Sequence, residues 1–291
     1  MENKTTRIKK KTLMQETWHR LKKNKGAMIG LGFLALLVLL ALLAPVIFDY
    51  ETDIIGQNIS ERLMKPCKEH WFGTDEVGRD LFARVIWGAR YSLVIGVGAV
   101  MLGLLVGLIT GSLAGFYGGI VDTLLMRAID IFYSIPNIMT AVVIVSVLGT
   151  STVNLVIALA FSCASSFGRI VRAQVMTIRD QEYVESSYAM GLPTWKIIVK
   201  HILPNCLSPI IVQITLLIGS TIISASSLSF LGIGIPAPSP EWGALLSAGR
   251  SHIRDASYMC VIPGLAVMLT VLALNLLGDG LRDALDPKLK K

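Results

Sequence analysis

Charged residues are scarce in this chain, and five long stretches contain none at all. Asp, Glu, Lys and Arg make up 16% of the 291 residues, against about 25% in ordinary soluble domains. Because a helix needs about 20 apolar residues to cross a bilayer, these stretches exclude a soluble globular enzyme and predict an all-α, polytopic membrane protein. They also exclude a β-barrel, whose strands alternate apolar and polar residues. The charge-free stretches are residues 26–48, 91–121, 131–168, 201–240 and 256–278.

Cysteine and histidine are also few, and neither type forms a metal-binding or catalytic pattern. No two cysteines form a CxxC pair, and no histidine lies in the middle of an apolar stretch. An intramembrane serine protease would need a histidine within hydrogen-bond reach of its serine. We therefore expect no catalytic residue, no metal site and no disulfide framework. The residues concerned are Cys67, Cys163, Cys206 and Cys260, with His19, His70, His201 and His252.

Two further absences concern ATP hydrolysis and ion coupling. The sequence lacks the GxxxxGK[ST] loop that cradles nucleotide phosphates, so if the chain takes part in an ATP-driven process, the ATPase is another polypeptide. No Asp, Glu, Lys or Arg lies in the middle of an apolar stretch. Ion-coupled carriers and proton pumps keep such groups inside the membrane as partners for the coupled charge. The sequence therefore argues against secondary active transport.

The apolar stretches predict six membrane-spanning helices. The 131–168 stretch is too long for one helix, and the turn-rich segment 149–154 divides it into two. Prolines at both ends of the 201–240 stretch confine its helix to the middle, because proline is disfavoured in helix interiors. The first helix is too long for a cleaved signal peptide. The expected spans are residues 28–48, 91–115, 129–148, 153–172, 207–230 and 257–278.

The distribution of Lys and Arg predicts how these helices are oriented. Both tails and the loops on their side carry nineteen of these residues, and the loops on the other side carry eight. Cytoplasmic loops are the richer in Lys and Arg, so both termini are expected in the cytoplasm. The orientation of the helices in the membrane also accounts for the net charge of +7. Nucleic-acid binding is not expected, because the sequence has no basic patch interleaved with aromatic residues on which bases could stack. The expected organisation is a cytoplasmic tail (1–27), a first helix (28–48), an external loop (49–87), a transmembrane core (88–280, with a cytoplasmic loop at about 179–205) and a second cytoplasmic tail (281–291).

Glycines repeat along one side of the second predicted helix. Four of them are spaced four residues apart, which places them on one helical face and lets another helix approach closely. The pattern predicts tight helix packing, with a neighbour either in this chain or in a partner. These glycines are Gly103, Gly107, Gly111 and Gly115.

The fifth predicted helix carries a polar face. Spacings of seven, four and three residues place one glutamine and three serines on the same side. Two interpretations remain open: serine hydroxyls that bond back to their own helix in a packed interface, or a wet pathway that passes a polar solute. The four residues are Gln213, Ser220, Ser224 and Ser227.

The cytoplasmic loop between the fourth and fifth spans contains a recognisable pattern. It reads as a short helix, a Gly191–Pro193 break, and a second short helix with Thr194 as its N-cap. The loop resembles the cytoplasmic motif of binding-protein-dependent ABC import permeases: Glu-Ala-Ala, three residues, Gly, nine residues, Ile-x-Leu-Pro. Both spacings match, with serine at the two alanine positions and histidine at the isoleucine position. The matching residues are Glu185, Ser186, Ser187, Gly191, His201, Leu203 and Pro204.

The resemblance extends to the C-type permease subunits of dipeptide, oligopeptide and nickel importers. It implies the type I ABC importer fold in a prokaryotic cytoplasmic membrane, with lipid around the spans. It also implies a heterodimer with a B-type permease, two cytoplasmic ATPases that bind ATP and Mg²⁺, and an external solute-binding protein. The permease needs no cofactor, and its Glu185–Pro204 loop couples ATPase closure to the spans. Further matching segments are His70, Gly73–Asp75, Gly78–Asp80, Arg84, Gly88, Arg90, Ser92, Leu228–Gly234 and Gly278–Pro287.

Within this family the sequence favours peptides as the substrate, because a polar pathway offers hydrogen-bond partners to a peptide backbone. Nickel or a nickel chelate is the alternative, with His70 and His252 on the outer side. A passive channel or secondary carrier also fits the topology alone. The Glu185–Pro204 loop discriminates against it, since a channel has no ATPase to dock.

Overall fold

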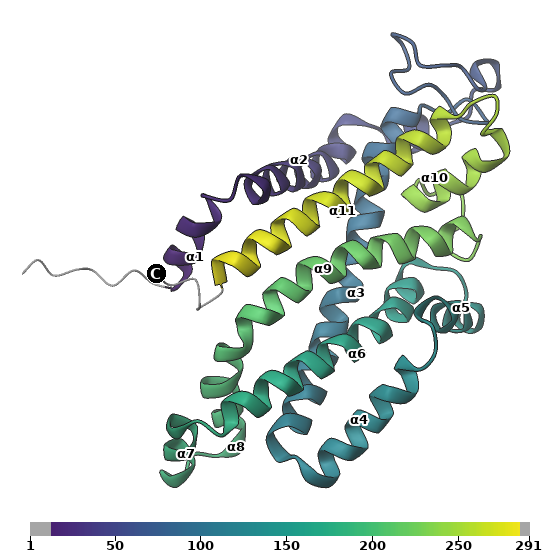
Figure 1. Ribbon diagram of the computed structural model, residues 1–291. Coiled ribbons are helices and arrows are strands. Elements are labelled where there is room, and N and C mark those ends of the chain that lie inside the picture. The colour runs from purple at the N-terminus through teal and green to yellow at the C-terminus, as the bar shows by residue number, and fades with distance from the viewer. Residues whose placement is uncertain (1–12, 286–291) are drawn as a thin grey trace, which may run out of the picture.

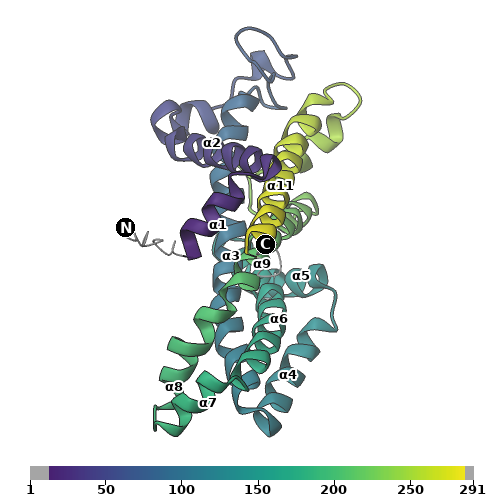
Figure 2. The same cartoon turned by 60° about the vertical axis from the view of Figure 1, so that its left-hand side comes forward.

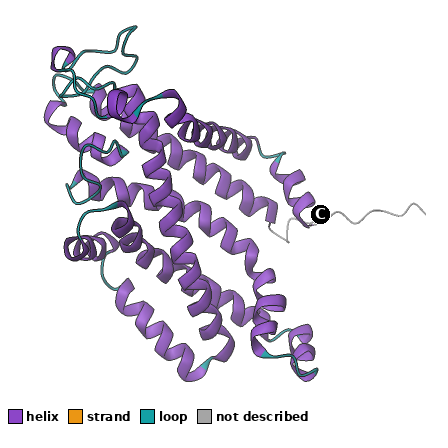
Figure 3. Cartoon of the chain, turned by 180° about the vertical axis from the view of Figure 1, so that it is seen from behind, coloured by secondary structure: helices purple, strands orange, loops and turns teal. Residues whose placement is uncertain are grey.

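The computed structural model describes residues 13–285, and within them it contains helices and loops but no β-strand (Figures 1 and 3). The outermost parts of both predicted tails, residues 1–12 and 286–291, lie outside the described residues. So do Asp286 and Pro287 of the C-terminal matching segment. The all-α class predicted from the sequence is confirmed for the described chain.

Within residues 13–285, five helices are long and apolar enough to cross a membrane. They begin and end close to the predicted spans, but several are longer. In particular, α3 begins at Leu81 rather than at residue 91, and α9 begins at Leu203 rather than at residue 207, so that it contains both Pro204 and Pro209. The five are α2 (Lys25–Ile47), α3 (Leu81–Tyr117), α6 (Thr152–Arg179), α9 (Leu203–Phe230) and α11 (Tyr258–Leu285).

The third predicted span, residues 129–148, is wrong as a single helix. The segment 119–148 instead forms two helices that are bent by 85° at a short break. The break contains Pro136, which lacks the N–H that would continue the helix. At the other end of the segment, Gly118 ends α3 and Gly119 begins the next helix, both with positive φ. The residues between the second and third predicted spans therefore lie largely in a helix, α4 (Gly119–Tyr133), rather than in a loop. Counting the bent pair as one span gives six spans.

Shorter helices and single turns join the long ones. Two of the short helices, α7 (Glu182–Ala189) and α8 (Thr194–Ile197), project from the end of the molecule opposite the loop that joins α2 to α3 (Figures 1 and 2). The short helices are α1 (Leu13–Leu21), α4 (Gly119–Tyr133), α5 (Asn137–Leu148), α7 (Glu182–Ala189), α8 (Thr194–Ile197) and α10 (Trp242–Gly249). Single turns cover Tyr50–Ile54, Ile59–Glu61, Ile198–Ile202 and Arg250–His252.

The core connects the long helices with the α7–α8 segment. α6 packs against α3 and α9, while α11 packs between α9 and α2 (Figure 1). Phe167 of α6 lies fully buried in the largest apolar cluster, which also includes Val184 of α7 and Ile197 of α8. Burial of such side chains contributes about 1.5–3 kcal/mol each. The short helices α7 and α8 are therefore attached to the helix bundle by apolar packing.

Candidate functional site

The four glycines of α3 all face α6 of the same chain. A β-carbon at Gly103 or Gly107 would overlap the β-carbon of Cys163 or Phe167. At Gly111 it would lie 2.5 Å from the carbonyl oxygen of Gly168, and at Gly115 it would lie 2.8 Å from that of Arg172. Glycine is needed where two backbones approach this closely. The α3–α6 pair is thus a close-packed unit, and its C-terminal end lies beside α7.

Helix α7 is bound to the bundle on one side and open on the other. Val184 and Ser187 are buried, while Glu185 and Ser186 are exposed. The hydroxyls of Ser186 and Ser187 donate hydrogen bonds to the carbonyls four residues earlier, each at 2.7 Å. Serine at the two positions where the motif has alanine is therefore accommodated within the helix itself.

The turn after α7 requires glycine. Gly191 has φ +76°, and its N–H donates to the carbonyl of Tyr188 at 2.9 Å. A β-carbon there would meet nothing within 4 Å, so the requirement comes from the backbone angle and not from crowding. Pro193 then occupies the N-cap position of α8 without a side-chain hydrogen bond. The prediction that Thr194 is the N-cap is wrong, because Thr194 is the first residue of the helix.

Large apolar side chains are exposed around this turn. Tyr188, Met190 and Trp195 are 62%, 72% and 61% exposed. Beyond them, His201 and Leu203 are half-buried and Pro204 is exposed at the start of α9. An exposed apolar group on a projecting segment is typical of a surface that binds another protein. The motif residues Glu185 to Pro204 are brought together here on two short helices and the turn that follows them.

A cavity of about 750 Å³ lies between α7 and the end of α3. Glu185 and Tyr188 line it from α7, opposite Phe116 and Tyr117 of α3. Sequence reasoning missed the two aromatic residues; the signal was an aromatic pair directly before two glycines at the end of a span. The side chain of Arg179 crosses to the same place and donates to the carbonyl of Gly115 at 2.9 Å.

The serines of the polar face of α9 bond back to their own helix, which is one of the two interpretations that the sequence left open. Ser220, Ser224 and Ser227 donate hydrogen bonds to carbonyls of their own helix at 3.0, 3.0 and 2.8 Å. This arrangement matches the packing interpretation. Gln213 instead donates to the hydroxyl of Ser166 on α6 at 3.3 Å. It also lines a cavity of about 520 Å³ between α6, α9 and α11.

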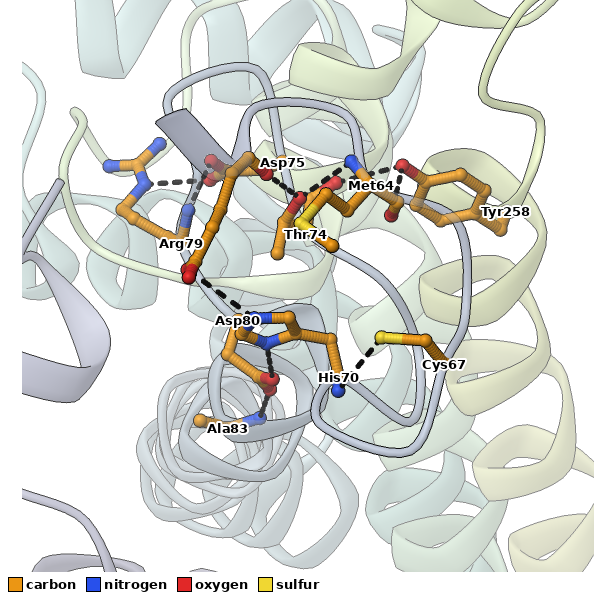
Figure 4. Close-up of polar contacts among 10 residues, drawn as sticks. Met64, Cys67, His70, Thr74, Asp75, Arg79, Asp80, Ala83 and Tyr258 are labelled. Carbon is orange, nitrogen blue, oxygen red and sulfur yellow. Dashed lines mark hydrogen bonds and ion pairs between the residues drawn. The ribbon is translucent and has the colours of Figure 1, made fainter. Parts of the chain in front are cut away.

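Ion pairs stabilise the loop between α2 and α3, which lies at the end of the molecule opposite α7 and α8 (Figure 4). The Nδ1 atom of His70 lies 2.7 Å from the Asp80 carboxylate, and its Nε2 lies 3.4 Å from that of Glu61. The hydrogen bond to Asp80 raises the pKa of His70 above its usual value, and the charge of Glu61 adds to this effect. Asp80 also caps α3 by accepting from the N–H of Ala83 at 2.9 Å.

A second, buried set of charges ties the same loop to neighbouring elements. Asp75 pairs with Arg79 at 2.6 Å and with Arg84 at 3.6 Å. Arg84 donates onward to the carbonyls of Ile54 and Pro238 at 2.7 and 3.3 Å. Buried charges need such partners. The segments from His70 to Arg84 that resembled the permease family therefore form one network around the start of α3.

Among residues 13–285, no group of three His, Cys, Asp or Glu residues is arranged to hold a metal ion. His70 is engaged by two carboxylates, and His252 lies 3.5 Å from Glu76. The four cysteines are free thiols.

Two known families match separate parts of the chain. Residues 103–291 match the profile of the binding-protein-dependent transport system inner membrane component. Residues 12–66 match the N-terminal TM domain of oligopeptide transport permease C. Both matched segments include elements described above, namely the α7–α8 segment and α2.

Named relatives align over almost their full lengths. The dipeptide transport system permease protein DppC of Alkalihalophilus pseudofirmus is 45% identical, over 95% of this chain and 90% of the relative. The glutathione transport system permease protein GsiD of Escherichia coli is 43% identical, over 96% and 92%. DppC of Haemophilus influenzae is 42% identical, over 97% of both chains.

A solved structure shares the fold. A chain of the MetNI methionine ABC transporter, in an inward-facing conformation, superposes with a TM-score of 0.57 at 21% identity, over 70% of this chain and 96% of that chain. Together with the profile match and the relatives, this shows that the chain belongs to the family of binding-protein-dependent transport system inner membrane components and has the fold of an ABC importer permease.

Proposed function

We propose that this chain is the C-type permease subunit of an ABC importer that carries di- or oligopeptides across a prokaryotic cytoplasmic membrane. The relatives named for dipeptides and glutathione support the substrate class. Both termini and the α7–α8 segment lie in the cytoplasm in this proposal, in line with the distribution of Lys and Arg.

The observation that carries the proposal is the projecting α7–α8 segment. Its exposed side chains, Tyr188, Met190 and Trp195, form a contact surface for a cytoplasmic ATPase. Its buried side chains, Val184 and Ile197, pack in the same cluster as Phe167 of α6. A displacement of α7 by a moving ATPase is therefore passed to α6, because a packed core transmits strain.

Glu185 and the adjoining cavity add polar contacts to this surface. Glu185 is exposed at the cavity rim beside Asp180. Asp180 already pairs with Arg179 at 3.1 Å, so it is the Glu185 carboxylate that suits a basic side chain of the ATPase, which would place its apolar stem against Phe116 and Tyr117. The ATPase subunits bind ATP and Mg²⁺ and carry out the hydrolysis, and this chain contributes no catalytic group.

The complete importer in this proposal contains four further polypeptides. A B-type permease pairs with this chain, two ATPases dock beneath the pair, and an external solute-binding protein delivers the peptide. Gln213, Ser220, Ser224 and Ser227 line the pathway between the permeases. Their oxygen and nitrogen atoms offer hydrogen bonds to peptide groups that leave water.

Nickel is not favoured as the substrate, and neither a channel nor a secondary carrier is retained. The relatives reported above are named for peptides, and the outer histidines are already paired with carboxylates. The family is described by its dependence on a binding protein, which a passive channel does not use, and no charged residue lies in the middle of an apolar stretch, as an ion-coupled carrier would require.

The experiment is uptake by the reconstituted importer in proteoliposomes. A labelled dipeptide should accumulate only when its binding protein and ATP are both supplied. A matched assay with Ni²⁺ should show no ATP-dependent accumulation. Peptide uptake without ATP, or nickel uptake in place of peptide uptake, would reject the proposed function.

A further inference from the structure

A cavity of about 390 Å³ opens at the end of the molecule opposite α7 and α8. Three elements meet there: the turn after α2, the first third of α3 and the start of α6. Its walls are aromatic and it contains one cationic group. The lining residues are Tyr50, Trp87, Arg90, Tyr91, Val94 and Thr152.

Arg90 carries a charge that the chain leaves uncompensated. Its guanidinium carbon lies 5.0 Å from the centre of the Trp87 ring, an arrangement that holds the cation in place. Within the described residues it has neither an ion pair nor a hydrogen-bond acceptor, whereas Arg79 and Arg84 nearby both pair with Asp75. An unpaired guanidinium group held in a cavity favours the binding of an anion there.

Sequence and structure place this cavity at the depth of the lipid headgroups. The charge-free stretch of α3 begins at residue 91, directly after Arg90, and α2 ends at Ile47, three residues before Tyr50. The rings of Tyr50 and Trp87 lie 5.3 Å apart. Tryptophan and tyrosine concentrate at the membrane–water interface, where a ring can be buried while its polar atom meets water.

An exposed apolar strip continues from the cavity along α3. Val94, Met101, Leu105 and Ile109 are 58%, 43%, 60% and 63% exposed. Spacings of seven, four and four residues keep them on the same helical face as Trp87 and Tyr91. An acyl chain can lie along such a strip, whereas a peptide backbone would find no hydrogen-bond partner on it.

We propose that the cavity binds the phosphate headgroup of an anionic phospholipid, with Arg90 donating to the phosphate and an acyl chain along the α3 strip. The hydroxyls of Tyr50 and Tyr91 supply further donors. Burial, together with neighbouring Tyr91, raises the pKa of Tyr50, so its phenol keeps its proton at neutral pH. The phosphate's negative charge meets the cation in a partly dehydrated site, where such a pair is stronger than in water. This site is independent of the proposed transport function.

The test is lipid binding to the purified full-length chain by native mass spectrometry, with phosphatidylglycerol and phosphatidylcholine as probes. The wild-type chain should retain phosphatidylglycerol in preference, and Arg90→Gln should weaken that binding at least about fivefold. Arg250→Gln is the matched control, because Arg250 also lies over an aromatic ring, Phe230, but does not line the cavity. Its binding should equal that of the wild type.

A second variant keeps the test valid if Arg90→Gln does not fold. Tyr91→Phe keeps the ring and removes only the hydroxyl, and should weaken phosphatidylglycerol binding about twofold or more. Equal binding by wild type, Arg90→Gln and Tyr91→Phe would overturn the proposal. So would displacement of the lipid by glycerol phosphate, which would assign the cavity to a soluble phosphate, or by a dipeptide, which would assign it to the transported solute.

Discussion

Gly107 of α3 and Phe167 of α6 lie so close that no side chain fits between the two helices. A β-carbon at Gly107 would overlap the β-carbon of Phe167 and lie 2.9 Å from the backbone nitrogen of Gly168. Phe167 is itself fully buried in the cluster that includes Val184 of α7. The contact therefore fixes the spacing of the helix pair to which the α7–α8 segment is attached.

We predict that Gly107→Leu destabilises the chain by about 1–3 kcal/mol or more, because overpacking forces two backbones apart. Thermal unfolding of the purified protein measures the effect. Gly32→Leu on α2 is the control, since a β-carbon there would meet nothing within 4 Å, and it should unfold as the wild type does. A Gly107→Leu protein with wild-type stability would show that α3 and α6 are not held at this spacing.

The loop between α2 and α3 should become less stable as the pH rises. The pKa of His70 is raised in the folded protein by Asp80 and Glu61, so its contribution is complete below the unfolded pKa of about 6.5. It is lost as the pH rises through the folded pKa. Limited proteolysis within residues 59–80 should be several-fold faster at about pH 8.5 than at about pH 6.

Two histidine variants separate this effect from a general one. His70→Gln should remove the pH dependence, because glutamine does not titrate. His252→Gln should retain it, although His252 also faces a carboxylate, that of Glu76. A pH dependence that survives in His70→Gln would assign it to another group.

Much of the bundle could be predicted because long apolar stretches have few alternatives to a membrane helix. Charged residues made the remaining helical segments look like loops. α3 continues through Arg84 because its guanidinium finds Asp75 and two backbone carbonyls. These partners come from other segments, and no local pattern shows them. Pro209 likewise lies inside α9, which begins at Leu203, four residues before the predicted start of this helix at residue 207.

The candidate site was predictable where it depended on a backbone turn and not where it depended on packing. Gly191 followed by Pro193 signalled a break, and Gly191 has the positive φ of such a turn. The cavity formed with Phe116 and Tyr117 joins residues more than sixty positions away in the sequence. Spacing within one helix does not indicate which helix lies opposite, so the glycines of α3 could be assigned to α6 only from the structure.

We predict that Trp195→Ala lowers substrate-stimulated ATP hydrolysis several-fold with little change in stability. Its side chain is 61% exposed, so its removal leaves no buried cavity and surface changes usually stay within about 0.5 kcal/mol. Trp18→Ala on α1 is the control, because Trp18 is also an exposed tryptophan, at 46%. Equal ATPase activity in the two variants would argue against contact between Trp195 and the ATPase.

The polar face of α9 should tolerate loss of a hydroxyl but not added bulk. Ser224→Ala removes only a hydrogen bond to the helix's own backbone and should leave both stability and uptake near wild type. Ser224→Leu should lower peptide uptake at least about tenfold while the complex still assembles, because a partly exposed position on the pathway would be filled. Normal uptake by the leucine variant would leave this face a packing surface.

In the proposed function, the α7–α8 turn couples an ATPase to the membrane helices. Gly191 tests this coupling directly, because its φ of +76° strains a residue with a β-carbon although the space around it is open. That strain amounts to about 1–2 kcal/mol. Gly191→Asn is the matched control, since asparagine tolerates this conformation better than other residues do.

The measurement is substrate-stimulated ATP hydrolysis and peptide uptake by the same reconstituted complex. For Gly191→Trp, we expect that the complex assembles and the binding protein docks, while hydrolysis and uptake fall together. Gly191→Asn should keep most of both activities. A Gly191→Trp complex with normal stimulated hydrolysis and normal uptake would contradict the coupling role and leave this segment an ordinary connection between α6 and α9.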